Sequence, residues 1–261
     1  MEEKRSSLVI PIAIIICILI LAGAFYYQSQ NPKLLAEQSG SQLAALGQLL
    51  PATEGVDLTK FRPVDNTDHL RGSATAPIKV VVYTDLECPA CKYFHTELRK
   101  LEADYVATGK VAIVFRDFPL DSLHAKSRNE FLAAECVNEI GGNEKFWQFV
   151  DQIFEITPAN DGLDLAKLGE TATSLGIETE GFDACMTTQK YADKIQGIVD
   201  EAFALGAQGT PFFVLVTPDQ NIPVFGGLPA ERLSAVFDLL LNPAPAVETQ
   251  TPVATTSDTV Q

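Results

Sequence analysis

The stretch that most constrains the fold is an apolar run that leads into Cys-Pro-Ala-Cys. Residues Val80 to Thr84 are mostly β-branched, without polar alternation, a pattern typical of a strand buried on both faces. After Pro89, apolar residues recur at helical spacing and form one helix face. These residues are Phe94, Leu98, Leu101 and Tyr105. Pro89 suits the first turn of a helix, so Cys88 is expected at a helix N-terminus, directly after a strand.

This placement predicts redox chemistry at the two cysteines. The first N–H groups of a helix lack internal partners and, together with the helix dipole, stabilise a thiolate. In such a motif the pKa of a cysteine can fall from about 8.5 to about 3.5–7.5. A spacing of three residues places Cys91 on the same side, within bonding reach. We therefore predict a dithiol in which Cys88 attacks and Cys91 resolves the mixed disulfide.

Two other interpretations of the motif are a structural zinc half-site and an inert disulfide. A structural zinc site usually needs four ligands, and a second Cys-x-x-Cys is absent from the sequence. The remaining cysteines are single, and the three histidines are scattered at positions 69, 95 and 124. The redox interpretation accordingly requires neither a metal nor a cofactor.

Length and charge set limits on the organisation and the partners. The 261 residues suffice for one good-sized domain plus appendages. The formal net charge of −15 argues against nucleic acid as a partner, because phosphate binding needs a basic surface.

The N-terminal region predicts export of the rest of the chain. Residues 8–27 form an uncharged apolar run long enough to cross a bilayer as a signal-anchor. Basic residues precede it, so residues 1–7 are expected to stay in the cytoplasm. The alternative is a cleaved signal peptide, since Ala22-Gly23-Ala24 fits the cleavage pattern. Either interpretation places the domain outside the cytoplasm, in the periplasm or at the cell surface, where disulfides persist. Cys17, inside the run, is expected to be inert.

The order of predicted elements indicates a small mixed α/β sheet with a helical block inserted at about 121–205. A second buried strand at 111–115 follows the Cys helix, which implies parallel pairing with the first strand. Further helices are predicted at 126–140, 144–155, 163–175 and 190–205, with a break at 176–181. The chain then returns through strands at 211–216 and 222–225, which are expected to pair antiparallel, to a last helix at 230–241.

The flanking segments carry weaker signals. Residues 28–72 are expected to form a stalk, or an extension that packs in part on the domain. Residues 243–261, rich in Pro, Ala, Thr and Val, are expected to form a disordered tail.

Several other residues are candidates for a role at or near the site. Cys136 and Cys185 suggest a structural disulfide in an exported domain; the alternative is two buried free thiols. Glu87 and Asp85 could relay a proton to or from Cys91, or could be exposed acids at the end of a strand.

Three further side chains have the same ambiguity. Asp117 follows a predicted strand and is open to both interpretations. His95 and His124 could lie near the dithiol, or could have surface or capping roles.

Pro211 is unusual because proline seldom begins a central strand without a special role. A cis peptide between Thr210 and Pro211 would place the Thr210 backbone beside the cysteine pair. An ordinary trans proline entering a strand is the alternative.

Taken together, these motifs resemble the DsbA-like thiol-disulfide oxidoreductases of the thioredoxin superfamily, in their membrane-anchored bacterial form. The resemblance is carried by residues 68–72, 83–91, 115–120 and 206–213. It implies a thioredoxin fold over residues 73–242, with the inserted helical domain and a cis Pro211. The resemblance also implies a second disulfide, as in similar family members. Around the pair Cys88 and Cys91, we expect the supporting residues to be Pro89, Ala90, Glu87, Thr210 and Pro211.

The resulting functional prediction is an extracytoplasmic oxidoreductase that oxidises cysteines of exported proteins. Its partners would be those proteins and a quinone-linked membrane thiol oxidase, DsbB- or VKOR-like, that restores the disulfide. Two alternatives remain: a reductase or isomerase, and a non-catalytic peptide-binding or chaperone module. Ala90 stands where the best-known oxidase of the family has histidine, which predicts a less oxidising pair.

Overall fold

The computed structural model describes residues 14, 18–20, 22–23 and 32–242. Most of the expected anchor at 8–27, and all of the tail at 243–261, lie outside the described residues. Among the residues described, no helix combines the length and apolar character that a membrane span requires. The chain divides into two units, 48–241 and a second made of 1–47 with 242–261. Helix α2 (Pro32–Leu49) lies mostly in the second unit.

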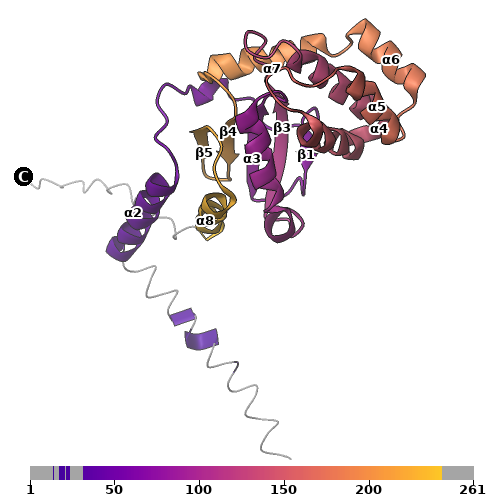
Figure 1. Cartoon of the computed structure of the whole chain (residues 1–261). Helices are drawn as coiled ribbons and strands as arrows, with labels where there is room; N and C mark the ends of the chain where they lie inside the picture. The colour runs from indigo at the N-terminus through magenta and orange to yellow at the C-terminus, as the bar shows by residue number, and fades with distance from the viewer. Residues whose placement is uncertain (1–13, 15–17, 21, 24–31, 243–261) are drawn as a thin grey trace, which may run out of the picture. The chain divides into compact units, whose positions relative to one another are not determined.

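The unit 48–241 is built on a five-stranded mixed sheet of order β1-β3-β2-β4-β5 (Figure 1). The strands are β1 (His69–Arg71), β2 (Ile78–Thr84), β3 (Val111–Asp117), β4 (Phe212–Val216) and β5 (Asn221–Phe225). The predicted parallel pairing of β2 with β3 is confirmed, with Val82 opposite Phe115. The predicted antiparallel pairing of β4 with β5 is also confirmed. Both β2 and β3 are buried almost throughout, as their unbroken apolar runs indicated.

Part of the expected stalk belongs to this unit, which begins at residue 48 and not at residue 73. Its last residues form β1, which pairs antiparallel with β3 at the edge of the sheet. A three-residue strand is too short to show a sequence period. Further upstream, the Thr53 hydroxyl donates to the Pro223 carbonyl at 2.8 Å, and the Asp57 N–H donates to the Leu205 carbonyl at 2.9 Å. The alternative of a packed extension therefore describes this part of the chain.

Helices surround the sheet and fill the segment between β3 and β4. They are α3 (Pro89–Arg99), α4 (Ser127–Ile156), α5 (Ala166–Ser174), α6 (Thr179–Thr188), α7 (Ala192–Leu205) and α8 (Ala230–Leu241), with short turns η1 (Leu58–Lys60) and η2 (Glu102–Val106). The break predicted at 176–181 is wrong in its second half, because α6 begins at Thr179. The Glu178 carboxylate accepts the N–H groups of Glu180 and Gly181 and so caps this helix. Two predicted helices are joined in α4, with non-helical backbone at Gly142.

A buried ion network ties the sheet to the extension and to α7. Arg116 is fully buried and pairs with Asp68 at 2.9 Å and with Glu201 at 2.8 Å. The Tyr83 hydroxyl accepts from Arg116 at 2.8 Å and donates to Glu201. Breaking one partner of such a pair leaves an uncompensated buried charge, so these contacts fix the extension on the sheet.

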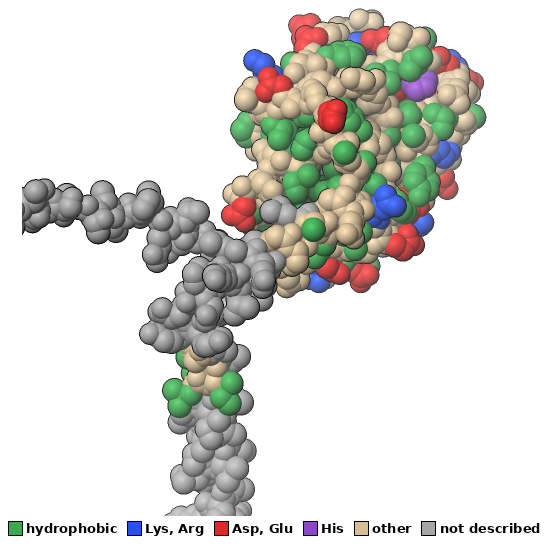
Figure 2. All heavy atoms as spheres, turned by 90° about the vertical axis from the view of Figure 1, so that its left-hand side faces the viewer, with side chains coloured by type: hydrophobic (Ala, Val, Ile, Leu, Met, Phe, Trp, Pro, Cys, Tyr) green, Lys and Arg blue, Asp and Glu red, His purple; other side chains and the backbone are tan. Residues whose placement is uncertain are grey.

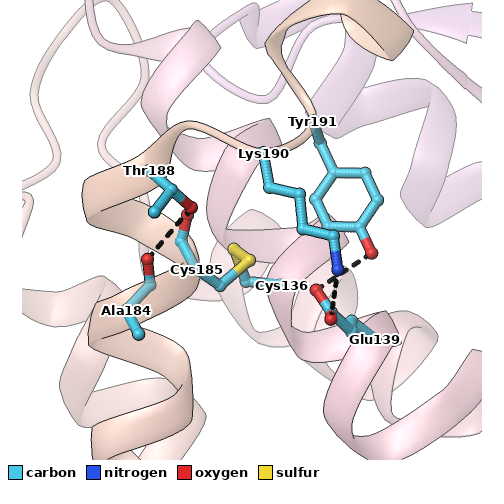
Figure 3. The surroundings of a disulfide bond; sticks show 7 residues. All are labelled: Cys136, Glu139, Ala184, Cys185, Thr188, Lys190 and Tyr191. Carbon is cyan, nitrogen blue, oxygen red and sulfur yellow. Dashed lines mark hydrogen bonds and ion pairs between the residues drawn. A yellow bond between two sulfur atoms is a disulfide. The ribbon is translucent and has the colours of Figure 1, made fainter.

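The helical block is cross-linked by a disulfide between Cys136 on α4 and Cys185 on α6 (Figure 3). Beside it, Glu139 accepts from Lys190 and from the Tyr191 hydroxyl, which brings the start of α7 to α4.

Hydrophobic side chains also reach the surface of this unit between charged ones, on the face seen from the left-hand side of Figure 1 (Figure 2).

Removing this cross-link should destabilise the domain. The disulfide spans 49 residues, and closing a loop of that length in the unfolded chain is worth about 4 kcal/mol in the chain-entropy model. We expect the free energy of unfolding of Cys136→Ala/Cys185→Ala to be lower by that amount, which lowers its midpoint of urea unfolding. The reference is the native protein with both active-site thiols reduced. An unchanged midpoint would contradict this expectation.

Candidate active site

The two cysteines of the motif lie where strand β2 gives way to helix α3. Cys88 is the N-cap residue, with extended backbone angles, and Pro89 begins the helix. The Cys88 N–H closes the preceding turn on the Asp85 carbonyl at 3.2 Å. Both cysteines are free thiols. Cys88 is 8% exposed and Cys91 is 1% exposed, so only the first sulfur can meet another protein.

The surroundings separate the two thiols electrostatically. The hydrogen bond from the Cys91 thiol, opposed by burial, is the main cause that lowers the pKa of Cys88 to about 6, and the backbone N–H groups of Cys91 and Ala90 add to it. Burial raises the pKa of Cys91 well above its ordinary value, and the neighbouring Cys88 sulfur adds to the shift. At neutral pH the pair is therefore a thiolate at Cys88 and a thiol at Cys91.

The peptide bond between Thr210 and Pro211 is cis. The Thr210 carbonyl oxygen lies 3.6 Å from the Cys88 sulfur. Beside Pro211, a surface groove of about 470 Å³ is lined by Glu54, Gln208, Gly209, Phe225 and Gly226. The groove brings the N-terminal extension, the cis-proline loop and β5 together, and Thr210, whose carbonyl lies beside the Cys88 sulfur, is part of its lining.

The acids that flank the motif are placed differently from either sequence interpretation. Asp85 and Glu87 are both fully buried, so the alternative of exposed acids is wrong. The Asp85 carboxylate accepts the Leu120 N–H at 2.8 Å and lies 3.0 Å from His124 Nδ1. The Asp85 backbone N–H, by contrast, donates to the Cys91 sulfur at 3.4 Å.

Glu87 is likewise engaged away from the dithiol. Its carboxylate accepts the N–H groups of Gly162 and Leu163, each at 3.3 Å. Its carbonyl accepts the Asn160 N–H at 2.8 Å. Glu87 therefore holds the loop after α4 against the start of α3, and among the described residues it makes no hydrogen bond to Cys91.

Sequence reasoning missed Glu130 on α4, which lies beside Glu87. Burial, followed by the Glu87 carboxylate, raises the pKa of Glu130 to about 10. Glu130 therefore keeps its proton at neutral pH. No local pattern marks Glu130, because its neighbour lies on another element.

Of the remaining candidates, Asp117 and His124 are buried and His95 is partly buried. Asp117 ends β3, and burial together with Glu135 raises its pKa well above the ordinary value. His95 on α3 lies 2.8 Å from the Asp151 carboxylate. His124 is 7% exposed and is paired with Asp85, so it has no surface role.

Comparison with known proteins agrees with this geometry. The family model described as Thioredoxin matches residues 64–216. The Na(+)/H(+) antiporter NhaA 3 of Salinispora tropica is 34% identical over 166 residues, 63% of this chain and 24% of that protein. The chain thus spans about a quarter of the length of the antiporter relatives that it matches.

Two further relatives are matched over most of their own length. A protein of Bacillus anthracis named "Probable disulfide bond formation protein D" is 25% identical over 218 residues, 81% of this chain and 88% of that protein. The crystal structure of alpha-DsbA1 from Wolbachia pipientis has a TM-score of 0.60 and 26% identity, covering 69% of this chain and 94% of that one. The resemblance to DsbA-like proteins, drawn from the sequence motifs, is confirmed.

The separation of the two thiols predicts selective alkylation. In the reduced protein, the rate at which iodoacetamide alkylates Cys88 should rise with pH to a plateau, because the thiolate is the nucleophile. The midpoint of this rise should lie at a pH of about 6. Cys91 should stay unmodified on the same time scale. Rates measured against pH, with peptide mass spectrometry to locate the label, check both statements. A midpoint near pH 8.5, the ordinary range, would contradict the first.

Proposed function

This chain belongs to the thioredoxin family, and from that premise we propose that it is a thiol-disulfide oxidoreductase that oxidises cysteines of exported proteins. The observation that carries the proposal is the depressed pKa of Cys88, about 6, beside a buried partner thiol. A low pKa makes Cys88 a good leaving group, and a stabilised thiolate favours the reduced form of the pair, which makes its disulfide an oxidant.

In the oxidising direction, a substrate thiolate attacks the Cys88 sulfur of the Cys88–Cys91 disulfide. The bond to Cys91 breaks, and Cys91 takes up the electron pair and a proton. A second substrate thiolate then attacks the substrate sulfur of the mixed disulfide, and Cys88 leaves as a thiolate. The substrate loses two electrons and the cysteine pair gains them. The exposure of Cys88 over Cys91 supports this order of attack.

The groove beside Pro211 is suited to the chain of a protein substrate. The Thr210 carbonyl lies beside the Cys88 sulfur, and Gly209 and Gly226 line the groove without side chains. An extended segment could hydrogen-bond there and place its cysteine at Cys88. Phe225 gives the groove an apolar wall, and Glu54 gives it one acidic side chain.

Location outside the cytoplasm and the partners belong to the same proposal. The Cys136–Cys185 disulfide supports an oxidising compartment, because such bonds are rare where thiols are kept reduced. The apolar run at 8–27 would anchor the domain to the membrane. A membrane thiol oxidase would then return the reduced dithiol to the disulfide.

A reductase or isomerase is the second candidate function. It is favoured by Ala90, because the motif contains no cation to stabilise the Cys88 thiolate. A non-catalytic peptide-binding module has less support, since the first thiol is reachable and its pKa is depressed.

Replacement of the first cysteine should abolish the reaction. We expect Cys88→Ser to lose oxidation of a dithiol peptide completely. Cys91→Ser, offered the disulfide form of the same peptide, should accumulate a mixed disulfide with it at Cys88, because the protein has no second thiol to resolve it. Non-reducing mass spectrometry of each reaction distinguishes the two variants. Oxidation that persists in Cys88→Ser would contradict the proposal.

The direction of electron flow follows from the reduction potential of the purified protein. We expect equilibration with glutathione to give a value between about −200 and −120 mV, since a strong oxidase lies near −120 mV and thioredoxin near −270 mV. A value at the thioredoxin end would favour the reductase instead.

A further inference from the structure

The buried thiol of Cys91 raises a question that the exchange chemistry leaves open. Cys91 is 1% exposed, so its sulfur cannot exchange a proton directly with bulk water. Each time the Cys88–Cys91 bond forms or opens, this sulfur must nevertheless lose or gain one. A group inside the protein has to take part in that transfer.

The carboxylates nearest in sequence are not placed for it. Asp85 is directed to Leu120 and His124. Glu87 is directed to the loop after α4. The proton partner must therefore come from another element or from further along α3.

His95 lies four residues after Cys91 on α3, on the same face of the helix. Both residues line one small cavity of about 10 Å³, which Thr84 and Trp147 also line. That volume is close to what one water molecule needs. The Trp147 indole N–H is buried and has no hydrogen-bond partner among the described residues. A water in the cavity could accept that N–H and bridge Cys91 to His95.

The state of His95 suits a proton acceptor. Its Nε2 lies 2.8 Å from an Asp151 oxygen. Burial opposes ionisation of Asp151, but the hydrogen bonds from His95 and Arg71 lower its pKa to about 2, so it remains a carboxylate. A carboxylate can only accept, so neutral His95 donates Nε2–H and keeps the Nδ1 lone pair free.

The other charges around His95 keep it neutral. Burial is the largest cause that lowers its pKa, and the guanidinium groups of Arg71 on β1 and Arg99 on α3 act in the same direction. Asp151 on α4 acts in the opposite direction. The Phe154 ring, also on α4, stacks on the imidazole with centroids 4.6 Å apart and contributes no charge.

We propose that His95, oriented by Asp151, exchanges the Cys91 proton through one water in this cavity. The inference rests on the proposed exchange reaction. When a mixed disulfide is resolved, the Cys91 S–H proton passes to the water, and the water passes a proton to Nδ1. The Cys91 sulfur bonds to the Cys88 sulfur while the bond from Cys88 to the substrate sulfur breaks, and the substrate leaves as a thiolate. In the oxidising direction the same transfers run in reverse: neutral His95 first takes up a proton at Nδ1, and a proton passes through the water to Cys91 as the disulfide opens.

A reagent that reacts with the two cysteines in successive steps tests the relay separately from the proposed function. Reduced protein mixed with dithiobis-nitrobenzoate should release one thionitrobenzoate when Cys88 attacks, and a second when Cys91 resolves the mixed disulfide. We expect His95→Gln to slow the second release about 100-fold, a typical size for general acid-base catalysis, and to leave the first release unchanged. Stopped-flow absorbance follows both.

The pH dependence of the second release distinguishes proton transfer by His95 from a purely structural role of that side chain. In the native protein the second rate should fall only below a pH of about 6.5, the ordinary His value, since the pKa of His95 is lowered. In His95→Gln it should climb with pH through the alkaline range as Cys91 ionises. Asp151→Asn should move the native inflection to lower pH, because the carboxylate raises the pKa of His95.

The control is His69→Gln, which removes another histidine paired with a carboxylate, here Glu135. It should keep the native second rate. A second release in His95→Gln with native rate and pH profile would overturn the relay, as would equal slowing in His69→Gln. Absence of the first release in the native protein would instead overturn the proposed function, and the relay with it.

Discussion

The structure of this site depends on one hydrogen bond, from the Cys91 thiol to the Cys88 sulfur. It is the largest influence that lowers the pKa of Cys88, and it exists only while Cys91 keeps its proton. Burial ensures this, because a second thiolate beneath the first would be both desolvated and repelled. The difference in exposure between two cysteines one helical turn apart thus decides which sulfur is nucleophile and which is the proton carrier.

That difference requires a rigid frame, which comes from elements distant in sequence. β2 is central in the sheet and almost fully buried, so the turn that presents Cys88 starts from a fixed point. Arg116 joins this sheet to the extension through Asp68 and to α7 through Glu201. The same extension lines the groove beside Pro211 through Glu54. The surface offered to a substrate is therefore fixed by ionic contacts in the interior.

Sequence patterns predicted those parts of this frame that depend on interactions between residues close together in the chain. The strand before Cys88, the helix after Pro89 and the parallel partner strand follow from apolar periodicity and proline chemistry. The pattern did not reveal β1, which exists because β3 offers an edge, or the start of α6, which depends on the Glu178 cap. The burial of Asp85 and Glu87 was equally hidden, because their partners Leu120 and Gly162 reach them only in the fold.

The same reasoning applies to the redox balance of the motif. Ala90 removes a cation from between the cysteines, but the fold brings another group close to them. Burial opposes protonation of His124, yet Asp85 and, next, the Cys88 thiolate raise the pKa of its imidazole. Coupling between two ionising groups is reciprocal, so a protonated His124 lowers the pKa of Cys88 in turn. The oxidising strength of this dithiol is set in part from outside the motif, and the two residues between the cysteines are not enough to rank it.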